Sequence, residues 1–239
     1  DQDIVALHIG RESSTEIWDV RIYGLSVARK TFDSSDGDNN TVGTGIYLDH
    51  VSEGRFVEVS AAGFRAGWDI NNGSITEFDY CKAYYCQYGI WMGATEPDGT
   101  GSRSQSASMA FRSWNLWKNG TGVVLSCATQ VQFDGCHMED CSVATFSIPA
   151  NATATGPWGI TIRGCNLRNY VADAYILAMV APAATSELQV FQFTIDDCLL
   201  QVYDCASAVD LSGVGGGYQS INMAVRNTWV RGVSTSAVA

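Results

Sequence analysis

Gly45-Ile46-Tyr47-Leu48, Gly67-Trp68-Asp69-Ile70 and Gly89-Ile90-Trp91-Met92 are three versions of one short phrase, and successive versions start 22 residues apart. The phrase returns at less even spacing as Gly122-Val123-Val124-Leu125, Ala144-Thr145-Phe146-Ser147, Ala174-Tyr175-Ile176-Leu177 and Ala208-Val209-Asp210-Leu211. A fixed period of about 20 to 30 residues indicates a solenoid, in which each repeat buries its apolar face against the next. The chain is therefore predicted to be a stack of similar coils.

A second column of similar phrases follows the first within each coil. Its members are Phe78-Asp79-Tyr80-Cys81, Phe111-Arg112-Ser113-Trp114, Phe133-Asp134-Gly135-Cys136, Ile162-Arg163-Gly164-Cys165, Ile195-Asp196-Asp197-Cys198 and Val225-Arg226-Asn227-Thr228, and Ile22-Tyr23-Gly24-Leu25 fits the same position. Short alternating apolar segments joined by turns are typical of strands rather than helices. We therefore predict an all-β fold, a single-stranded parallel β-helix of about eight coils in which each strand pairs with its counterpart in the next coil.

One position of the second column supports this register. Charge alternates in sign there over six successive coils: Asp79, Arg112, Asp134, Arg163, Asp196, Arg226. Opposite charges on neighbouring strands attract by a few tenths to about 1 kcal/mol, whereas like charges repel. The alternation is therefore favoured only if these coils are direct neighbours, and we interpret this column as structural.

Composition limits the partners of the chain. A net charge of -11 and a pI of about 4.5 argue against nucleic acid and anionic membranes as partners, and no apolar run is long enough to insert into a membrane. Eight cysteines are predicted to be buried free thiols, four of them stacked in an interior column. No cofactor and no metal ion is expected. The chain begins without methionine, so residues 1–239 are expected to be one domain cut from a longer chain.

The longest interruptions of the repeat gather at one corner. Segments 93–108, 149–158, 178–187 and 212–219 all fall between the first and second columns, and they are predicted to project from one edge as stacked loops. Segment 30–44 leaves at a different corner. Its aspartates resemble a calcium-binding loop but lack the closing glutamate, so a solvated loop is favoured. Long loops on a regular scaffold often carry function.

The candidate site lies on the outward side of the first column. Tyr47, Asp69 and Trp91 are predicted to face outward, followed by Val124, Phe146 and Ile176, which form either a subunit interface or a surface beneath the loops. Aromatic rings stack on sugars, and carboxylates accept hydrogen bonds from sugar hydroxyls. Coil spacing offers carboxyl separations of about 5 and 10 Å, near those used by glycosidases. The candidate catalytic residues are Asp69, Glu77, Glu96 and Asp49, and the candidate substrate-binding residues are Tyr47, Trp91, Asn71 and Arg103. The alternative interpretation is that these carboxylates are ordinary solvating residues.

Segments 131–148 (VQFDGCHMEDCSVATFSI) and 160–177 (ITIRGCNLRNYVADAYIL) resemble the coils of the right-handed, pectate-lyase-like β-helix superfamily, and the resemblance covers residues 17–233. Within it, the coils rich in tryptophan and glycine and laddered with cysteine most resemble the β-helix domains of bacteriophage tailspikes. The resemblance implies a homotrimer of the phage tail that binds bacterial capsular or O-antigen polysaccharide and often cleaves it with paired carboxylates. The sequence motifs of polygalacturonases and pectate lyases are absent.

Three functions are compatible with these features. The chain is a tailspike depolymerase, a non-catalytic receptor-binding or structural spike domain, or a secreted polysaccharide lyase or epimerase. The first two share the same surface and differ in whether the polymer is shortened. The third requires an export signal upstream of Asp1.

Overall fold

The computed structural model describes residues 4–10, 16–93, 95, 97, 105–148, 157–179, 189–203, 207–210 and 219–233. Within these ranges the chain forms strands, turns and one short 3₁₀ helix, η1 (Gly37–Asn39), with no α-helix. No helix in the described part is long and apolar enough to cross a membrane. The all-β prediction is therefore confirmed.

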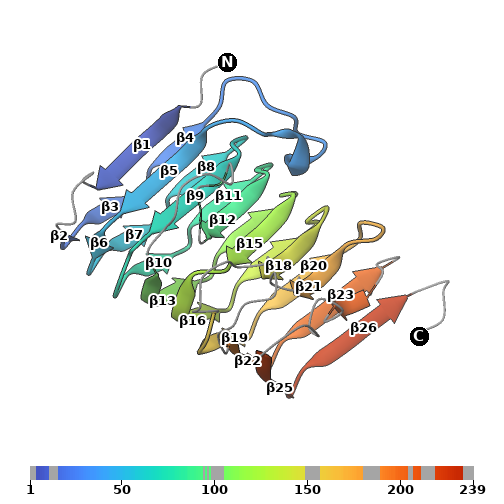
Figure 1. Ribbon diagram of the computed structural model, residues 1–239. Coiled ribbons are helices and arrows are strands. Elements are labelled where there is room, and N and C mark those ends of the chain that lie inside the picture. Colours follow the sequence, from blue (N-terminus) through green and yellow to red (C-terminus); the bar gives the residue numbers. More distant parts are fainter. Residues whose placement is uncertain are drawn as a thin grey trace.

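Three eight-stranded parallel sheets, here called sheets A, B and C, contain nearly all of the strands (Figure 1). Sheet A consists, in order, of β1 (Val5–Gly10), β5 (Thr44–Asp49), β9 (Ala66–Asn71), β12 (Tyr88–Met92), β15 (Thr121–Leu125), β18 (Ala144–Ile148), β21 (Tyr175–Met179) and β24 (Ser207–Asp210). Sheet B consists of β3 (Arg21–Tyr23), β7 (Arg55–Val57), β10 (Glu77–Asp79), β13 (Ser106–Arg112), β16 (Ala128–Asp134), β19 (Ile160–Arg163), β22 (Gln189–Asp196) and β25 (Gln219–Arg226). Sheet C consists of β4 (Ser26–Ala28), β8 (Ser60–Ala62), β11 (Lys82–Tyr84), β14 (Asn115–Trp117), β17 (His137–Glu139), β20 (Asn166–Asn169), β23 (Leu199–Tyr203) and β26 (Trp229–Val233). A two-stranded pair, β2 (Ile17–Trp18) and β6 (Val51–Ser52), adds to the first coils.

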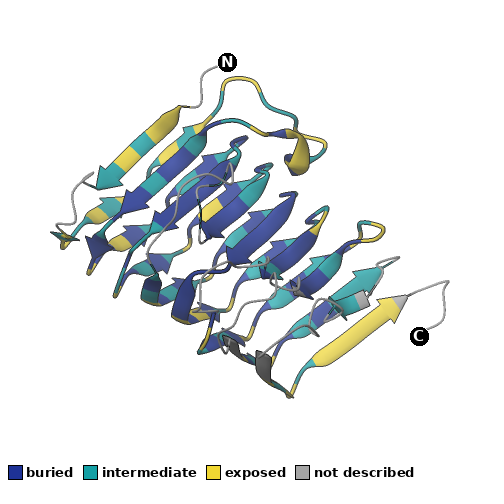
Figure 2. Cartoon of the chain, viewed as in Figure 1, coloured by how far each residue is buried: buried dark blue, intermediate teal, exposed yellow. Residues whose placement is uncertain are grey.

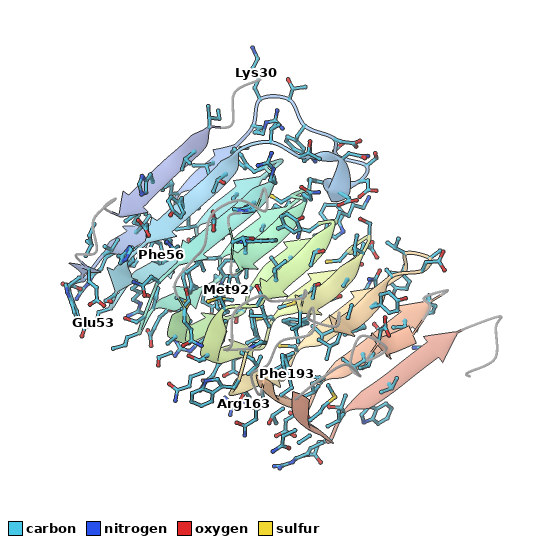
Figure 3. All side chains as sticks on the ribbon, viewed as in Figure 1. Lys30, Glu53, Phe56, Met92, Arg163 and Phe193 are labelled. Atoms are coloured by element: carbon cyan, nitrogen blue, oxygen red, sulfur yellow. The ribbon has the colours of Figure 1, made fainter. Side chains whose placement is uncertain are left out.

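The chain visits the three sheets in turn and then begins the next coil, so the strands stack along one axis from β1 to β26 (Figure 1). Because neighbouring side chains of a strand point to opposite faces, one face of every sheet lines a shared interior. Figure 2 shows this interior as buried along the middle coils, with exposed residues gathered toward both ends. Figure 3 labels Phe56 and Met92 of the core and the surface residue Arg163.

The second column is confirmed as the inner row of sheet B. Phe56, Phe78, Phe111 and Phe133 are successive register partners, and their rings stack with centroids 4.6 to 5.2 Å apart and interplanar angles of 1° to 15°. All four are fully buried. Like side chains therefore stack over like ones, because equal coil positions are brought one strand spacing apart.

The alternating charges are confirmed as an outer row of sheet B. Asp79 pairs in register with Arg112, Arg112 with Asp134, and Asp134 with Arg163, and the row continues to the end of the sheet. Arg163 donates two hydrogen bonds to the carboxylate of Asp134, at 2.7 and 3.1 Å. This guanidinium holds the pKa of Asp134 below its ordinary value.

Cysteines form the predicted interior ladder at the corner between sheets B and C. Cys136, Cys165 and Cys198 are buried at equivalent positions, and each thiol donates to a backbone carbonyl of the preceding coil. The seven cysteines in the described part are free and buried, as expected, and Cys205 lies outside the described residues. Burial raises the pKa of the Cys86 and Cys141 thiols to about 12.

The register of two coils in sheet A differs from the prediction. Val123 pairs with Phe146, and Phe146 pairs with Leu177, so both aligned phrases were misplaced, by one residue and by two. Phe146 and Ile176, expected to face outward, are fully buried in the main core instead. Val124 lies on the outer face, where it is buried against Trp91 and Ala66, so of the three predicted outward apolar residues only Val124 faces outward.

Glycine marks the start of the first column for a steric reason. A Cβ atom built on Gly89 would lie 2.6 Å from the carbonyl oxygen of Gly122, and Gly45 and Gly67 make the same close approach to the following coil. Glycine therefore suits these positions because the backbones of neighbouring coils approach closely there.

Four of the long segments leave at one corner, as predicted, because each joins a sheet A strand to the next sheet B strand. Most of their residues lie outside the described part. Segment 30–44 instead joins β4 of sheet C to β5 of sheet A, and η1 lies within it.

Candidate functional site

Tyr47, Asp69 and Trp91 are register partners on β5, β9 and β12 and form one row on the outer face of sheet A. Their neighbours along each strand, such as Ile46 and Leu48, belong to the interior core. The strand alternation that buries those neighbours places the row outside, as the sequence predicts.

This row is packed rather than open. Asp69 is only 2% exposed and Trp91 8%. The Trp91 ring lies 4.5 Å from that of Tyr88 and packs with Ala66 and Val124 in a small cluster separate from the main core. Its Nε1 donates a hydrogen bond of 2.8 Å to the carbonyl of Thr95. The indole is therefore fixed, and Asp69 is a nearly buried carboxylate beside it.

A hydrogen-bonded cluster lies at the C-terminal ends of β5 and β9. Asp49 Oδ1 accepts a hydrogen bond of 2.8 Å from Asn71 Nδ2 and contacts His50 Nδ1 at 2.8 Å. Asp49 is 6% exposed, whereas His50 is more accessible. Asn71 Oδ1 is buried and has no hydrogen-bond partner in the described part. Because Asp49 and Asn71 are register partners, the parallel pairing itself brings these groups together.

The Asp49–His50 contact determines what the imidazole can do. A carboxylate only accepts, so His50 Nδ1 carries a proton and Nε2 becomes the basic nitrogen of the neutral ring. No hydrogen bond holds that nitrogen within the described residues. An imidazole oriented by a carboxylate in this way is suited to take up or deliver a proton. The sequence interpretation missed this pair, although Asp49 and His50 are adjacent at a strand end.

The remaining predicted residues fall elsewhere. Glu77 lies on the outer face of sheet B, where it accepts a hydrogen bond of 3.1 Å from Arg112, so it faces outward from a different sheet than Asp69 does. Glu96 and Arg103 lie outside the described residues. Asp49, Asn71, Tyr47, Asp69 and Trp91 are thus the predicted residues that the structure gathers together.

The acidic segment 30–44 uses its carboxylates locally. Asp33 Oδ1 accepts from the hydroxyl and the backbone N–H of Ser35, and these hydrogen bonds lower the pKa of Asp33 to about 2. Asp36 accepts from the backbone N–H of Asp38. The described residues contain no group of three or more metal-ligating side chains.

No protein-family model and no curated protein matches the chain. A solved structure of an alginate lyase from Paenibacillus sp. FPU-7 is similar with a TM-score of 0.52 and 10% sequence identity, covering 94% of this chain and 99% of that one. This chain has the fold of the right-handed parallel β-helix proteins.

Two phage proteins resemble this β-helix less closely. They are the enzymatically active domain of tailspike protein 2 from bacteriophage CBA120 (TM-score 0.42, 10% identity, 91% of this chain and 37% of that one) and the tailspike receptor-binding domain of siphovirus 9NA (TM-score 0.32, 9% identity, 100% and 72%).

Proposed function

We propose that this β-helix binds and depolymerises a polysaccharide on the outer face of sheet A, with Asp49 and Asp69 as the carboxylate pair. The observation that carries the proposal is their placement. Asp69 on β9 pairs with Tyr47 on β5, and Asp49 follows Tyr47 by two residues on the same face of β5. Asp49 is therefore one strand away from Asp69 and displaced by two residues along the strand. The strand spacing and rise give a Cα separation of about 8 Å. Inverting glycosidases hold their two carboxyl groups about 6.5 to 9.5 Å apart, and backbone positions at this separation are compatible with such a pair.

The surroundings suit such a role. Tyr47 and Trp91 flank Asp69 in its row. Tyr47 is partly exposed, and aromatic rings are the usual platforms for sugar rings, whereas the buried Trp91 ring supports the other side of Asp69. Asn71 supplies a buried oxygen that has no hydrogen-bond partner in the described part, beside Asp49. The proposal extends to a homotrimeric phage tailspike that acts on capsular or O-antigen polysaccharide, which is supported by the resemblance of the coils to tailspike domains.

The test measures polymer length. Purified capsular and O-antigen polysaccharides and alginate are incubated with the protein, and chain length is followed by size-exclusion chromatography with light scattering. We expect D69N and D49N to slow depolymerisation about 100-fold or more, the usual loss for a general acid or base. The control is D210N, which changes an aspartate at the far end of sheet A in the continuation of the same row. Equal activity in all four proteins overturns the assignment, and binding without shortening favours a receptor-binding domain.

A polysaccharide lyase is the second candidate, and the Asp49–His50 contact favours it. β-Elimination requires a base that removes the proton next to a carboxylate, and His50 Nε2 is such a base. A lyase produces an unsaturated sugar that absorbs ultraviolet light, whereas a hydrolase produces only new reducing ends. We expect H50Q to abolish the absorbing product if this route operates. H137Q is the control, since His137 lies on sheet C beside Glu139.

A further inference from the structure

Segment 30–44 is held across several coils at the corner between sheets C and A. Asn40 Nδ2 donates to the carbonyls of Asp33 and Tyr85, at 2.8 and 2.7 Å. Further along, Asp36 Oδ1 accepts a hydrogen bond of 2.9 Å from Ser142 Oγ, which is 106 residues away in sequence. The segment thus runs along the solenoid axis rather than around a coil.

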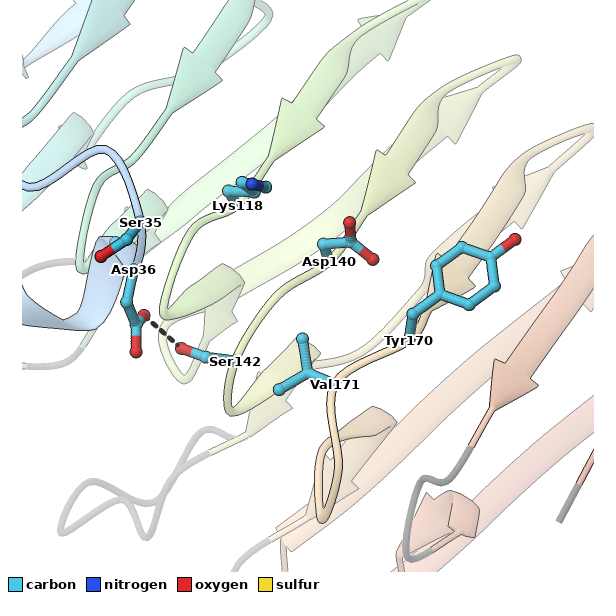
Figure 4. A pocket seen from close by; sticks show the side chains of 8 residues that line it. Ser35, Asp36, Lys118, Asp140, Ser142, Tyr170 and Val171 are labelled. Carbon is cyan, nitrogen blue, oxygen red and sulfur yellow. Dashed lines mark hydrogen bonds between the residues drawn. The ribbon is translucent and has the colours of Figure 1, made fainter.

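A cleft of about 210 Å³ lies between this segment and the corner (Figure 4). Ser35, Asp36 and Gly37 line one side, Lys118, Asp140 and Ser142 line the solenoid side, and Tyr170 and Val171 complete it. Pockets for drug-sized ligands have volumes of about 300 Å³ or more, so this cleft fits a smaller unit.

Two charged groups line the cleft: Asp140, whose carboxylate also interacts with the backbone N–H of Tyr170, and Lys118. Asp140 Oδ1 is buried and accepts no hydrogen bond within the described part. Burial, followed by the charge of Glu139, raises the pKa of Asp140. Lys118 makes no ion pair in the described ranges, and its ammonium lies 5.2 Å from the centre of the Trp117 ring. A buried carboxylate oxygen without a donor is costly, which indicates that an external donor completes it.

Tyr170 borders one end of the cleft, and its hydroxyl points away from Asp140 and Ser142 (Figure 4). Its ring stacks on Tyr203 with centroids 4.5 Å apart, and the Arg168 guanidinium lies 5.2 Å from its centre. The ring is nevertheless 40% exposed. The ring is therefore held in place by its neighbours and forms a fixed wall at this end of the cleft.

We propose that this cleft binds a single neutral hexose unit. A sugar presents adjacent hydroxyls that both donate and accept, and the cleft offers a carboxylate acceptor in Asp140, an ammonium donor in Lys118 and the Ser142 oxygen, which donates to Asp36 and can still accept. A uronate or phosphate group is disfavoured because Asp36 and Asp140 already contribute negative charge, and a divalent cation is disfavoured by Lys118. The site is at the opposite end of the sheet A strands from Asp49, so it is independent of the proposed polymer cleavage.

The test is binding of methyl glycosides. The full chain is titrated with methyl glucoside, galactoside, mannoside and rhamnoside, and with glucuronate, by calorimetry and by saturation-transfer NMR. We expect at least one neutral glycoside to bind and glucuronate not to bind. D140N and K118M are expected to weaken binding about tenfold or more, the usual effect of losing a charged hydrogen bond.

D197N is the matched control. Asp197 has φ 53° and Asp140 has φ 55°, so the same substitution is made in the same backbone conformation at another corner. Circular dichroism checks that all variants are folded. If D140N does not fold, K118M alone tests the cleft. Binding of no neutral glycoside, preference for glucuronate, or equal weakening by D197N would each overturn the proposal. Loss of polymer cleavage in D69N with hexose binding retained separates this site from the proposed function.

Discussion

Phe111→Ala tests whether the phenylalanine stack is the main source of stability in the middle coils. Phe111 is fully buried on β13, and its ring lies between Phe78 at 4.6 Å and Phe133 at 4.9 Å, with Trp114 edge-on at 5.2 Å. Truncation of a buried phenylalanine costs about 3 to 5 kcal/mol, and each aromatic pair contributes about 0.5 to 1.5 kcal/mol beyond burial. With three ring partners lost, we expect the upper end of that range, about 5 kcal/mol.

Phe111→Leu separates volume from stacking. Leucine fills most of the space but loses the ring contacts, so we expect a cost of about 1 to 2 kcal/mol. Urea unfolding followed by circular dichroism measures both variants, with attention to the slope because coils of a solenoid can unfold separately. The control is Tyr23→Ala, at a residue that is 59% exposed, with an expected change within about 0.5 kcal/mol. A loss below about 2 kcal/mol for Phe111→Ala, or equal losses for alanine and leucine, would refute the reasoning.

Three further predictions concern the outer charges, the thiols and the glycine column. In a double-mutant cycle at pH 7, Arg163 and Asp134, 60% and 36% exposed, should couple by about 0.3 to 1 kcal/mol; because the pKa of Asp134 is lowered, this coupling should disappear as the pH falls below about 4. Burial raises the pKa of Cys86 from 9.0 to about 12, so the contribution of this thiol to the free energy of unfolding is complete below pH 9 and is lost as the pH rises toward 12. In thermal melts, Cys86→Ala should therefore lose less stability between pH 9 and pH 12 than the unchanged protein does. Gly89→Ala should cost more than about 2 kcal/mol in urea unfolding, because its Cβ would meet a backbone oxygen at 2.6 Å, whereas Gly232→Ala, with no atom nearer than 3.6 Å, should be nearly neutral.

The strand pairing of sheet B was predictable because its signals are chemical and repeated. The phenylalanine row and the alternating charges each depend on contact between neighbouring coils, so a misaligned coil would have broken both patterns. Sheet A was harder to align. Thr145 occupies the position that glycine holds in the earlier coils, but the preceding Ala144 is small like glycine and was aligned there instead. Phe146 was therefore predicted to face outward, although it is an inner residue.

The site was only partly predictable for a different reason. Tyr47, Asp69 and Trp91 follow from the repeat, since equal positions stack. The contact between Asp49 and His50 does not, because adjacent residues of a regular strand point to opposite faces; here His50 has φ 55°, so the strand ends and its ring reaches the carboxylate. The cleft beside segment 30–44 depends on a contact between residues 106 apart in sequence, Asp36 and Ser142, and that segment has no repeat at all.

Asp49→Asn separates a structural role from a functional one for the cluster at the end of β5 and β9. Asp49 is nearly buried and accepts through a single oxygen, so an asparagine oxygen can receive the same bond from Asn71 while removing a charge that is costly to bury. At about pH 8, where imidazoles are neutral, we expect the free energy of unfolding to change by less than about 1 kcal/mol, or to rise. Polymer cleavage should nevertheless fall, because one carboxylate of the proposed Asp49–Asp69 pair is gone. A sequence selected for stability alone would not keep a buried carboxylate that can be neutralised without cost. A loss of more than about 2 kcal/mol in urea unfolding would instead make Asp49 a structural residue, and the assignment of the pair with Asp69 would fail with it.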